Sequence, residues 1–187
     1  MRIVGGMLRG RPIRTPPGAD TRPTSDRARE AIFNILAHAP WAPALEDARI
    51  LDLFAGSGAM GLEALSRGAA SCLFVEQAEP ALAAIRANLE ALAASGRARL
   101  LRQDATRLSR RPEQEAPFDL AFLDPPYGKG LGEAALLALG AGGWLAEGAI
   151  AVLERAADEP RLDLPGFELL DQRRYGAAQV AFLTPSP

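Results

Sequence analysis

The sequence predicts an α/β protein built on a doubly wound, mostly parallel sheet of about seven strands. Two observations support this class. Between residues 49 and 154, short apolar runs alternate with helical patterns, which is typical of parallel strands joined by helical crossovers. The last two strand-like runs, near the C-terminus, have no helix between them and predict an antiparallel edge hairpin. The expected architecture is therefore Rossmann-like, with a small N-terminal hairpin and helix in front of the sheet.

The N-terminal part reads as an extension of the main domain. Residues 2–5 and 12–14 predict a short hairpin, and a turn-rich loop follows it. Thr24 or Ser25 can cap a helix that runs to about Ala37. We therefore divide the chain into an extension, residues 1–40, and a main domain, residues 41–187.

The main domain should contain five parallel strands followed by the hairpin. Strands are expected at 49–54, 72–76, 98–102, 118–124 and 149–154. Helices are expected at 57–67, 79–94 and about 131–140, and Gly96 is the expected stop of the second. The two hairpin strands should meet at Gly176.

Composition indicates a globular protein without a metal. Of 187 residues, 48% are hydrophobic and 24% are charged, and no apolar stretch is long enough to span a membrane. The start of the chain is too polar for a secretory signal. Cys72 is the one cysteine and His38 the one histidine, so an internal disulfide and a histidine-based metal site are excluded. We expect a cytoplasmic protein in which Cys72 is a buried core thiol.

Charge is distributed unevenly along the chain. The first 36 residues hold seven arginines against three acidic residues, a net charge of +4, while the remainder carries −6. A basic arm on an acidic body favours docking of a polyanion at the N-terminal end. A solvated charge run explains the same arginines equally well.

The segment "DLFAGSGAMG", residues 52–61, carries glycines in the spacing G-x-G-x-x-G. Glu76 follows Gly56 by 20 positions, as the dinucleotide fingerprint requires. A glycine loop before a helix favours an anion, either a pyrophosphate or a carboxylate. Asp52, within the strand, would repel a pyrophosphate and attract an ammonium or sulfonium. The loop therefore favours S-adenosylmethionine, while a structural role for Asp52 remains the alternative.

Acidic residues also follow the later strands. Glu76 can accept hydrogen bonds from both ribose hydroxyls, and Asp104 is either an acceptor for an adenine amino group or a helix cap. The sharpest feature is "DPPY", residues 124–127. Asp124 and the carbonyl of Pro125 form a pair of acceptors for an exocyclic amine, and Tyr127 offers a flat face on which a base can stack.

These residues carry a resemblance to a known family. "DLFAGSG", Glu76, "DA" at 104–105 and "DPPY" resemble class I S-adenosylmethionine-dependent methyltransferases that act on exocyclic amines. "RIVGGMLRGRPIRTPPG", "TRPTSDRAREAIFNIL", "DLFAGSGAMGLEALSRGA" and the late "RRYG" resemble a narrower group. This group is the bacterial 16S ribosomal RNA guanine-N2 methyltransferase family of the RsmD type, and the resemblance covers nearly the full chain.

The resemblance implies methyl transfer from S-adenosylmethionine to the N2 amine of a guanine in 16S ribosomal RNA. It implies a substrate within an assembling small ribosomal subunit, and we expect a monomer. The implied cofactor-binding residues are Arg22, Thr24, Asp52, Phe54, Ala55, Gly56, Gly58, Glu76, Gln77, Asp104 and Ala105. The guanine would be held by Asp124, Pro125, Pro126 and Tyr127, and RNA phosphates by Arg9, Arg11, Arg14 and Arg29.

Three other functions remain open at this point. A DNA adenine-N6 methyltransferase would share the cofactor residues and "DPPY", but 187 residues leave little room for a target-recognition domain. A nicotinamide oxidoreductase explains the glycines and leaves Asp52 and "DPPY" unexplained. A non-catalytic RNA-binding module explains the arginines and leaves the pocket without a role.

Overall fold

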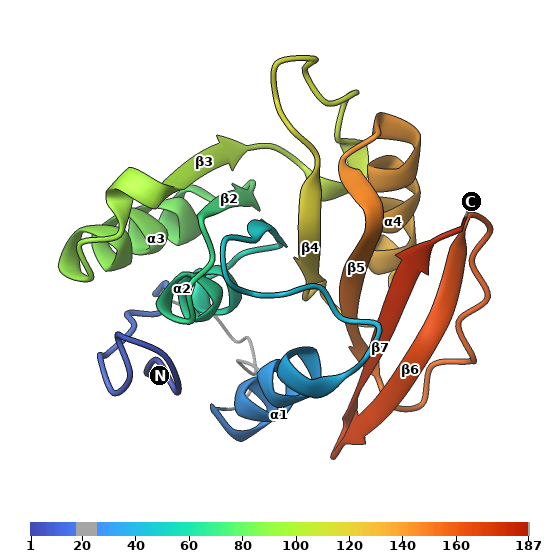
Figure 1. The fold of residues 1–187 in the computed structure, drawn as a ribbon, viewed down its shortest axis with the longest axis horizontal. Helices are drawn as coiled ribbons and strands as arrows, with labels where there is room; N and C mark the ends of the chain where they lie inside the picture. The colour runs from blue at the N-terminus through green and yellow to red at the C-terminus, as the bar shows by residue number, and fades with distance from the viewer. Residues whose placement is uncertain (18–25, 187) are drawn as a thin grey trace.

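One mixed sheet of seven strands organises the computed structural model, which describes residues 1–17 and 26–186 (Figure 1). The strand order is β3-β2-β1-β4-β5-β7-β6. The strands are β1 (Arg49–Leu53), β2 (Ser71–Glu76), β3 (Ala98–Arg102), β4 (Phe118–Leu123), β5 (Leu145–Ala156), β6 (Phe167–Tyr175) and β7 (Ala178–Pro185). The first five run parallel, and β7 pairs antiparallel with both β5 and β6. The predicted fold class is confirmed.

Helices cover both faces of this sheet. They are α1 (Asp26–His38), α2 (Ala59–Ser66), α3 (Glu79–Ala91) and α4 (Leu131–Gly142), with short 3₁₀ helices η1 (Ser95–Arg97) and η2 (Ala105–Arg107). Successive strand side chains point to opposite faces. Ile50 and Phe122 therefore pack with α1, α2 and α3, whereas Leu51 and Leu123 pack with α4.

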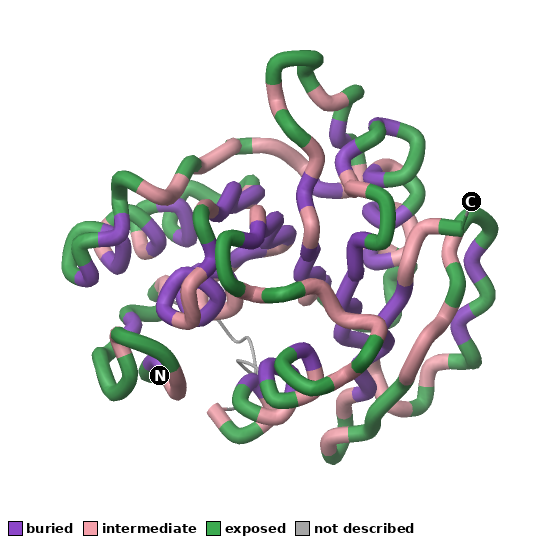
Figure 2. Tube along the Cα trace, in the orientation of Figure 1, coloured by how far each residue is buried: buried purple, intermediate pink, exposed green. Residues whose placement is uncertain are grey.

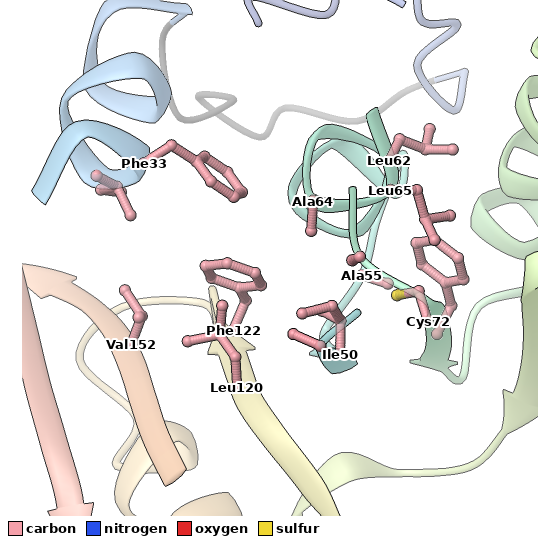
Figure 3. Packing of buried hydrophobic residues seen from close by; sticks show 14 of the residues in the cluster. Phe33, Ile50, Ala55, Leu62, Ala64, Leu65, Cys72, Leu120, Phe122 and Val152 are labelled. Carbon is pink, nitrogen blue, oxygen red and sulfur yellow. The ribbon is translucent and has the colours of Figure 1, made fainter. Parts of the chain in front are cut away.

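The central strands are buried on both faces, as the purple segments of Figure 2 show. Phe33 of α1 lies opposite Phe122 of β4, with ring centroids 5.4 Å apart (Figure 3). Leu62 and Leu65 of α2 are fully buried above the same face of the sheet. Cys72 is buried there too, as its apolar surroundings in the sequence predicted.

Several element boundaries differ from the sequence prediction, and three of these differences are the most informative. Helix α2 begins at Ala59 and not at residue 57. Helix α3 ends at Ala91, so Gly96 lies in η1 and is not the helix stop. Strand β5 begins at Leu145 and continues through Gly148, whose φ of 71° is left-handed. A glycine inside a strand marks an irregularity that sequence patterns read as an end.

The N-terminal segment, residues 1–17, packs against the main domain. The predicted hairpin is reduced to a single antiparallel bridge between Arg2 and Pro12, with no regular strand on either side. Ile3 and Ile13 are buried in the same hydrophobic cluster as the sheet. In Figure 1 this dark-blue segment lies beside α2. The division at residue 40 remains a prediction, since side chains from both parts share one core.

The strand order places a switch point between β1 and β4. Strand β1 leads through α2 to β2 on one side, while β4 lies on its other side and leads through α4 to β5. Ligands of open α/β sheets bind outside the carboxyl ends of strands at such a point. Among the described residues, no helix combines the length and apolar character that crossing a membrane requires.

Candidate active site

A pocket of about 530 Å³ opens at the carboxyl ends of β1, β2 and β4. This volume lies within the range typical of small-molecule sites. Its lining consists of Met1, Thr15, Pro16, Pro17, Asp52, Phe54, Ala55, Gly56, Ser57, Ala59, Met60, Glu76, Ala78, Pro80, Ala81 and Asp124. The pocket therefore lies at the switch point, where the sequence placed the ligand.

The loop after β1 has an unusual backbone. Phe54, Gly56 and Gly58 have φ values of 55°, 56° and 77°. Left-handed conformations suit glycine, and a non-glycine residue such as Phe54 adopts them at a cost typical of functional loops. A Cβ on Gly61 would lie 2.4 Å from the Phe74 ring, so this third glycine lets α2 approach β2 closely.

Asp52 is a buried carboxyl at the floor of the pocket, with 3% of its surface exposed. Its Oδ2 accepts a hydrogen bond from the Gly61 backbone N–H at 2.9 Å, in the first turn of α2. Burial raises the pKa of Asp52 to about 8; the Gly61 bond lowers it, and the charges of Asp124 and Glu76 raise it further. Asp52 therefore ties down a helix and also faces the pocket, and its contact with a cofactor ammonium stays a prediction.

Glu76 is held by three backbone amides from two loops. Its Oε2 accepts from Gly56 at 3.0 Å, and its Oε1 accepts from Gln77 at 2.8 Å and Ala78 at 2.9 Å. Each carboxylate oxygen has two lone pairs, so capacity remains for a further donor such as a ribose hydroxyl. Gln77 itself is exposed and its side chain is outside the pocket lining.

Three carboxyl groups converge on this pocket. Asp52, Glu76 and Asp124 line it, and no lysine or arginine of residues 1–17 and 26–186 belongs to the lining. Such a site attracts cationic groups and repels phosphates. The residues present therefore fit S-adenosylmethionine, which carries an ammonium and a sulfonium, better than they fit a pyrophosphate-bearing dinucleotide.

The Asp-Pro-Pro-Tyr loop continues from the pocket beyond β4. Asp124 lines the pocket, and Pro125 behind it is buried. The Tyr127 hydroxyl donates a hydrogen bond to Glu154 of β5, while 39% of the residue stays exposed. Burial, together with the hydrogen bond to Glu154, raises the pKa of Tyr127, so the hydroxyl remains a donor. The loop thus presents a ring anchored at its polar end.

Asp104 and Ala105 lie outside the pocket lining. Asp104 Oδ1 accepts from the backbone N–H of Thr106 at 2.9 Å and from its hydroxyl at 2.8 Å, so Asp104 caps η2. The Thr106 hydroxyl and backbone bonds lower the pKa of Asp104. Ala105 is buried in the cluster on the α4 face. The interpretation of Asp104 as a cap holds, and adenine recognition by this pair stays a prediction.

The expectation that Arg29 contacts RNA does not hold in the structure. Arg29 is 0% exposed, donates to Asp26 Oδ1 at 2.8 Å and to the Arg2 carbonyl, and lies 3.6 Å from Glu63. It ties α1 to α2 and to the N-terminal segment. The other predicted RNA contacts, Arg9, Arg11 and Arg14, are exposed. Two predicted cofactor contacts, Arg22 and Thr24, lie outside the described residues.

Sequence reasoning missed several residues of the site. Met1, Thr15, Pro16 and Pro17 of the N-terminal segment line the pocket. Asn88 of α3 is 1% exposed and bonds to the loop after β1, although it does not line the pocket. Its position, three residues after Ile85 on the apolar side of α3, is the one signal that could have revealed it.

The sheet order, the glycine loop after β1 and the acidic pocket define the class I methyltransferase type of α/β fold. A family model described as "Conserved hypothetical protein 95" matches residues 1–184, and the chain belongs to this family. Together with the relatives described next, this match confirms the family membership expected from the sequence. Among residues 1–17 and 26–186, no group of three or more acidic, histidine or cysteine side chains is placed to hold a metal ion.

Known proteins of the same type span nearly the whole chain. The ribosomal RNA small subunit methyltransferase D of Escherichia coli is 38% identical over 97% of this chain and 87% of its own. The protein of that name from Haemophilus influenzae is 33% identical over 94% of this chain and 89% of its own. A solved structure of a proposed methyltransferase from Escherichia coli, yhhF, superposes with a TM-score of 0.83 at 34% identity, covering 99% of this chain and 97% of that one.

Proposed function

We propose that this protein transfers a methyl group from S-adenosylmethionine to the exocyclic N2 amine of a guanine in 16S ribosomal RNA. One observation carries the proposal. Asp124 belongs both to the acidic pocket and to the Asp-Pro-Pro-Tyr loop. A methyl donor in the pocket and an amine on the loop would therefore meet at a single carboxylate.

The pocket residues have distinct roles toward the donor. S-adenosylmethionine, when bound, supplies an electrophilic methyl group on a sulfonium. Asp52 holds the ammonium by charge, and the loop of Gly56 and Gly58 receives the methionine carboxylate at the start of α2. Glu76 accepts from the ribose hydroxyls, because its carboxylate is already oriented by backbone amides. These contacts distinguish the donor from NAD, whose phosphates the carboxylates of Glu76 and Asp124 would repel and whose structure offers no ammonium to Asp52.

The loop after β4 would hold the acceptor. The Asp124 carboxylate and the Pro125 carbonyl would accept hydrogen bonds from the two N–H groups of the exocyclic amine, which aims the nitrogen lone pair at the methyl group. Asp124 also stabilises the positive charge that develops on this nitrogen. The Tyr127 ring stacks on the base, and its hydroxyl stays fixed on Glu154. Positioning of both reactants supplies much of the barrier reduction.

The printed names of the relatives support ribosomal RNA of the small subunit as the substrate. Exposed Arg9, Arg11 and Arg14 would contact its phosphates from the N-terminal segment. An acidic body with one basic edge suits a substrate that is already partly covered by ribosomal proteins. We therefore infer a monomeric cytoplasmic enzyme that acts on an assembling small subunit.

Mapping of modified nucleosides tests this proposal. The protein is incubated with labelled S-adenosylmethionine and small subunits assembled from unmodified 16S ribosomal RNA, and the RNA is digested for mass spectrometry. The expected product is N2-methylguanosine at one position. Label in N6-methyladenosine of duplex DNA would favour the DNA methyltransferase alternative. Stabilisation by NADH but not by S-adenosylhomocysteine would overturn methyl transfer altogether.

A further inference from the structure

The N-terminal segment contributes to two binding regions at once. It supplies one wall of the pocket, made of Met1, Thr15, Pro16 and Pro17. It also carries three exposed arginines, Arg9, Arg11 and Arg14. Arg14 directly precedes the pocket-lining Thr15, so a displacement of the wall also displaces the arginine. Neither binding region is complete unless this segment lies against the main domain.

Asn88 of α3 holds the segment where the two regions meet. Its side-chain Nδ2 donates to the carbonyl of Arg14 at 2.9 Å and to the carbonyl of Ser57 at 3.0 Å. Its Oδ1 accepts from the backbone N–H of Arg14 at 2.8 Å. Both amide hydrogens are used, and Asn88 is 1% exposed. One buried side chain thus joins the N-terminal segment to the glycine loop after β1.

We infer that Asn88 is a positioning residue that preorganises the cofactor pocket and the RNA-contacting arginines together. The inference rests on the proposed function. When a ligand binds only one of two conformations, its apparent affinity falls by the fraction of molecules in that conformation. In the native protein, Asn88 keeps the N-terminal segment against the main domain in nearly all molecules. Without it, each ligand must first bring the segment back into place, and the second ligand then benefits from the first.

Ser66 of α2 offers a matched control on the same segment. Its hydroxyl donates to the carbonyl of Gly5 at 2.6 Å and accepts from the backbone N–H of Leu8 at 2.9 Å. Ser66 is 1% exposed, so its loss also removes buried hydrogen bonds. The turn that it holds, residues 5–8, does not line the pocket. Ser66→Ala therefore loosens the segment away from the pocket.

The test measures binding of S-adenosylhomocysteine and of small subunits assembled from unmodified 16S ribosomal RNA, each with and without the other ligand. Asn88→Ala should weaken both affinities roughly ten-fold if the segment is in place about one-tenth of the time. Saturating S-adenosylhomocysteine should then restore most of the subunit affinity of Asn88→Ala. In the native protein and in Ser66→Ala, each ligand should change the affinity for the other by less than about two-fold.

The outcomes separate this inference from the proposed function. Native protein that does not bind S-adenosylhomocysteine refutes methyl transfer itself. If the native protein binds S-adenosylhomocysteine and both affinities of Asn88→Ala are unchanged, only the role of Asn88 is overturned. The same holds if Asn88→Ala loses affinity for small subunits and saturating S-adenosylhomocysteine fails to restore it. An equal loss of S-adenosylhomocysteine affinity in Ser66→Ala would also overturn the role of Asn88, because the turn that Ser66 holds does not line the pocket. If Asn88→Ala does not fold, Asn88→Asp keeps the acceptor for Arg14 and loses both donors; unchanged affinities in folded Asn88→Asp would likewise overturn the role of Asn88.

Discussion

Proton release on cofactor binding is the most direct test of the acidic pocket. Without a ligand the pKa of Asp52 is about 8, mainly because the carboxyl is buried. A bound ammonium favours the ionised carboxylate, so binding should lower this pKa and release the proton. At pH 6, two units below the pKa, about one carboxyl in a hundred is ionised. Affinity for S-adenosylhomocysteine should therefore rise roughly ten-fold, or about 1.4 kcal/mol, between pH 6 and pH 7, and about five-fold between pH 7 and pH 8, where the free carboxyl is already half ionised.

Calorimetry in buffers of different ionisation enthalpy measures both the affinity and the number of protons released on binding. We expect close to one proton released per ligand at pH 6 to 7, falling toward zero above pH 8. Asp52→Asn should bind weakly with little pH dependence. Asp104→Asn is the control for the pH dependence alone and should keep the native slope of affinity against pH, since Asp104 lies outside the pocket lining and its pKa is lowered. An affinity that is flat from pH 6 to pH 8 in the native protein would refute the reasoning.

The same raised pKa has a consequence for the stability of the ligand-free protein. Between the ordinary pKa of 3.8 and about 8, folded Asp52 holds a proton that the unfolded chain releases. The contribution of this group to the free energy of unfolding therefore falls as pH rises through that window. In Asp52→Asn the oxygen that accepts from Gly61 can remain while the titration is lost. The midpoint temperature of thermal unfolding should fall less between pH 5 and pH 8 in the variant than in the native protein. An equal fall in both proteins would contradict the assignment of the raised pKa to Asp52.

Three further predictions concern chemistry, RNA binding and packing. Asp124→Ala should lower the methylation rate by about 10²–10³-fold while S-adenosylhomocysteine still binds in calorimetry; full activity would refute the amine clamp. Gly61→Ala should lower the free energy of unfolding by about 1–3 kcal/mol in urea titration, because its Cβ would meet Phe74 and Cys72 within 2.5 Å, whereas Gly96→Ala meets nothing within 4 Å and should be neutral. Replacing the exposed Arg9, Arg11 and Arg14 by alanine should reduce the slope of log affinity for small subunits against log salt concentration by about 2–3. An unchanged slope would show that these arginines face solvent and not RNA.

Several parts of the site were predictable because their chemistry is local. The glycine spacing requires left-handed backbone, and Gly56 and Gly58 adopt it. Strand ends meet at one edge of a parallel sheet, so Asp52, Glu76 and Asp124 could be expected to converge. The boundaries were less predictable, as β5 shows, since pairing with a neighbouring strand carries it through a glycine.

Other residues could not be assigned because their roles depend on distant partners. Arg29 resembles any other arginine of a basic arm, yet Glu63, 34 positions later, pairs with it in the core. Asn88 and Arg14 are 74 positions apart and meet only after α3 packs on the sheet. A buried charge or amide is stable only where such partners satisfy it.

The sequence by itself determined the fold class, the place of the pocket at the switch point and the residue types from which we propose binding of a methyl donor and an exocyclic amine. These follow from hydrophobic periodicity, glycine spacing and the directions of parallel strands, which are properties of short segments. Only the tertiary structure decided which arginines face solvent and that the N-terminal segment completes the pocket. It also decided that Asp52 is buried enough for its pKa to reach about 8. Burial and long-range hydrogen bonds arise when segments far apart in the chain pack together, and no local pattern encodes them.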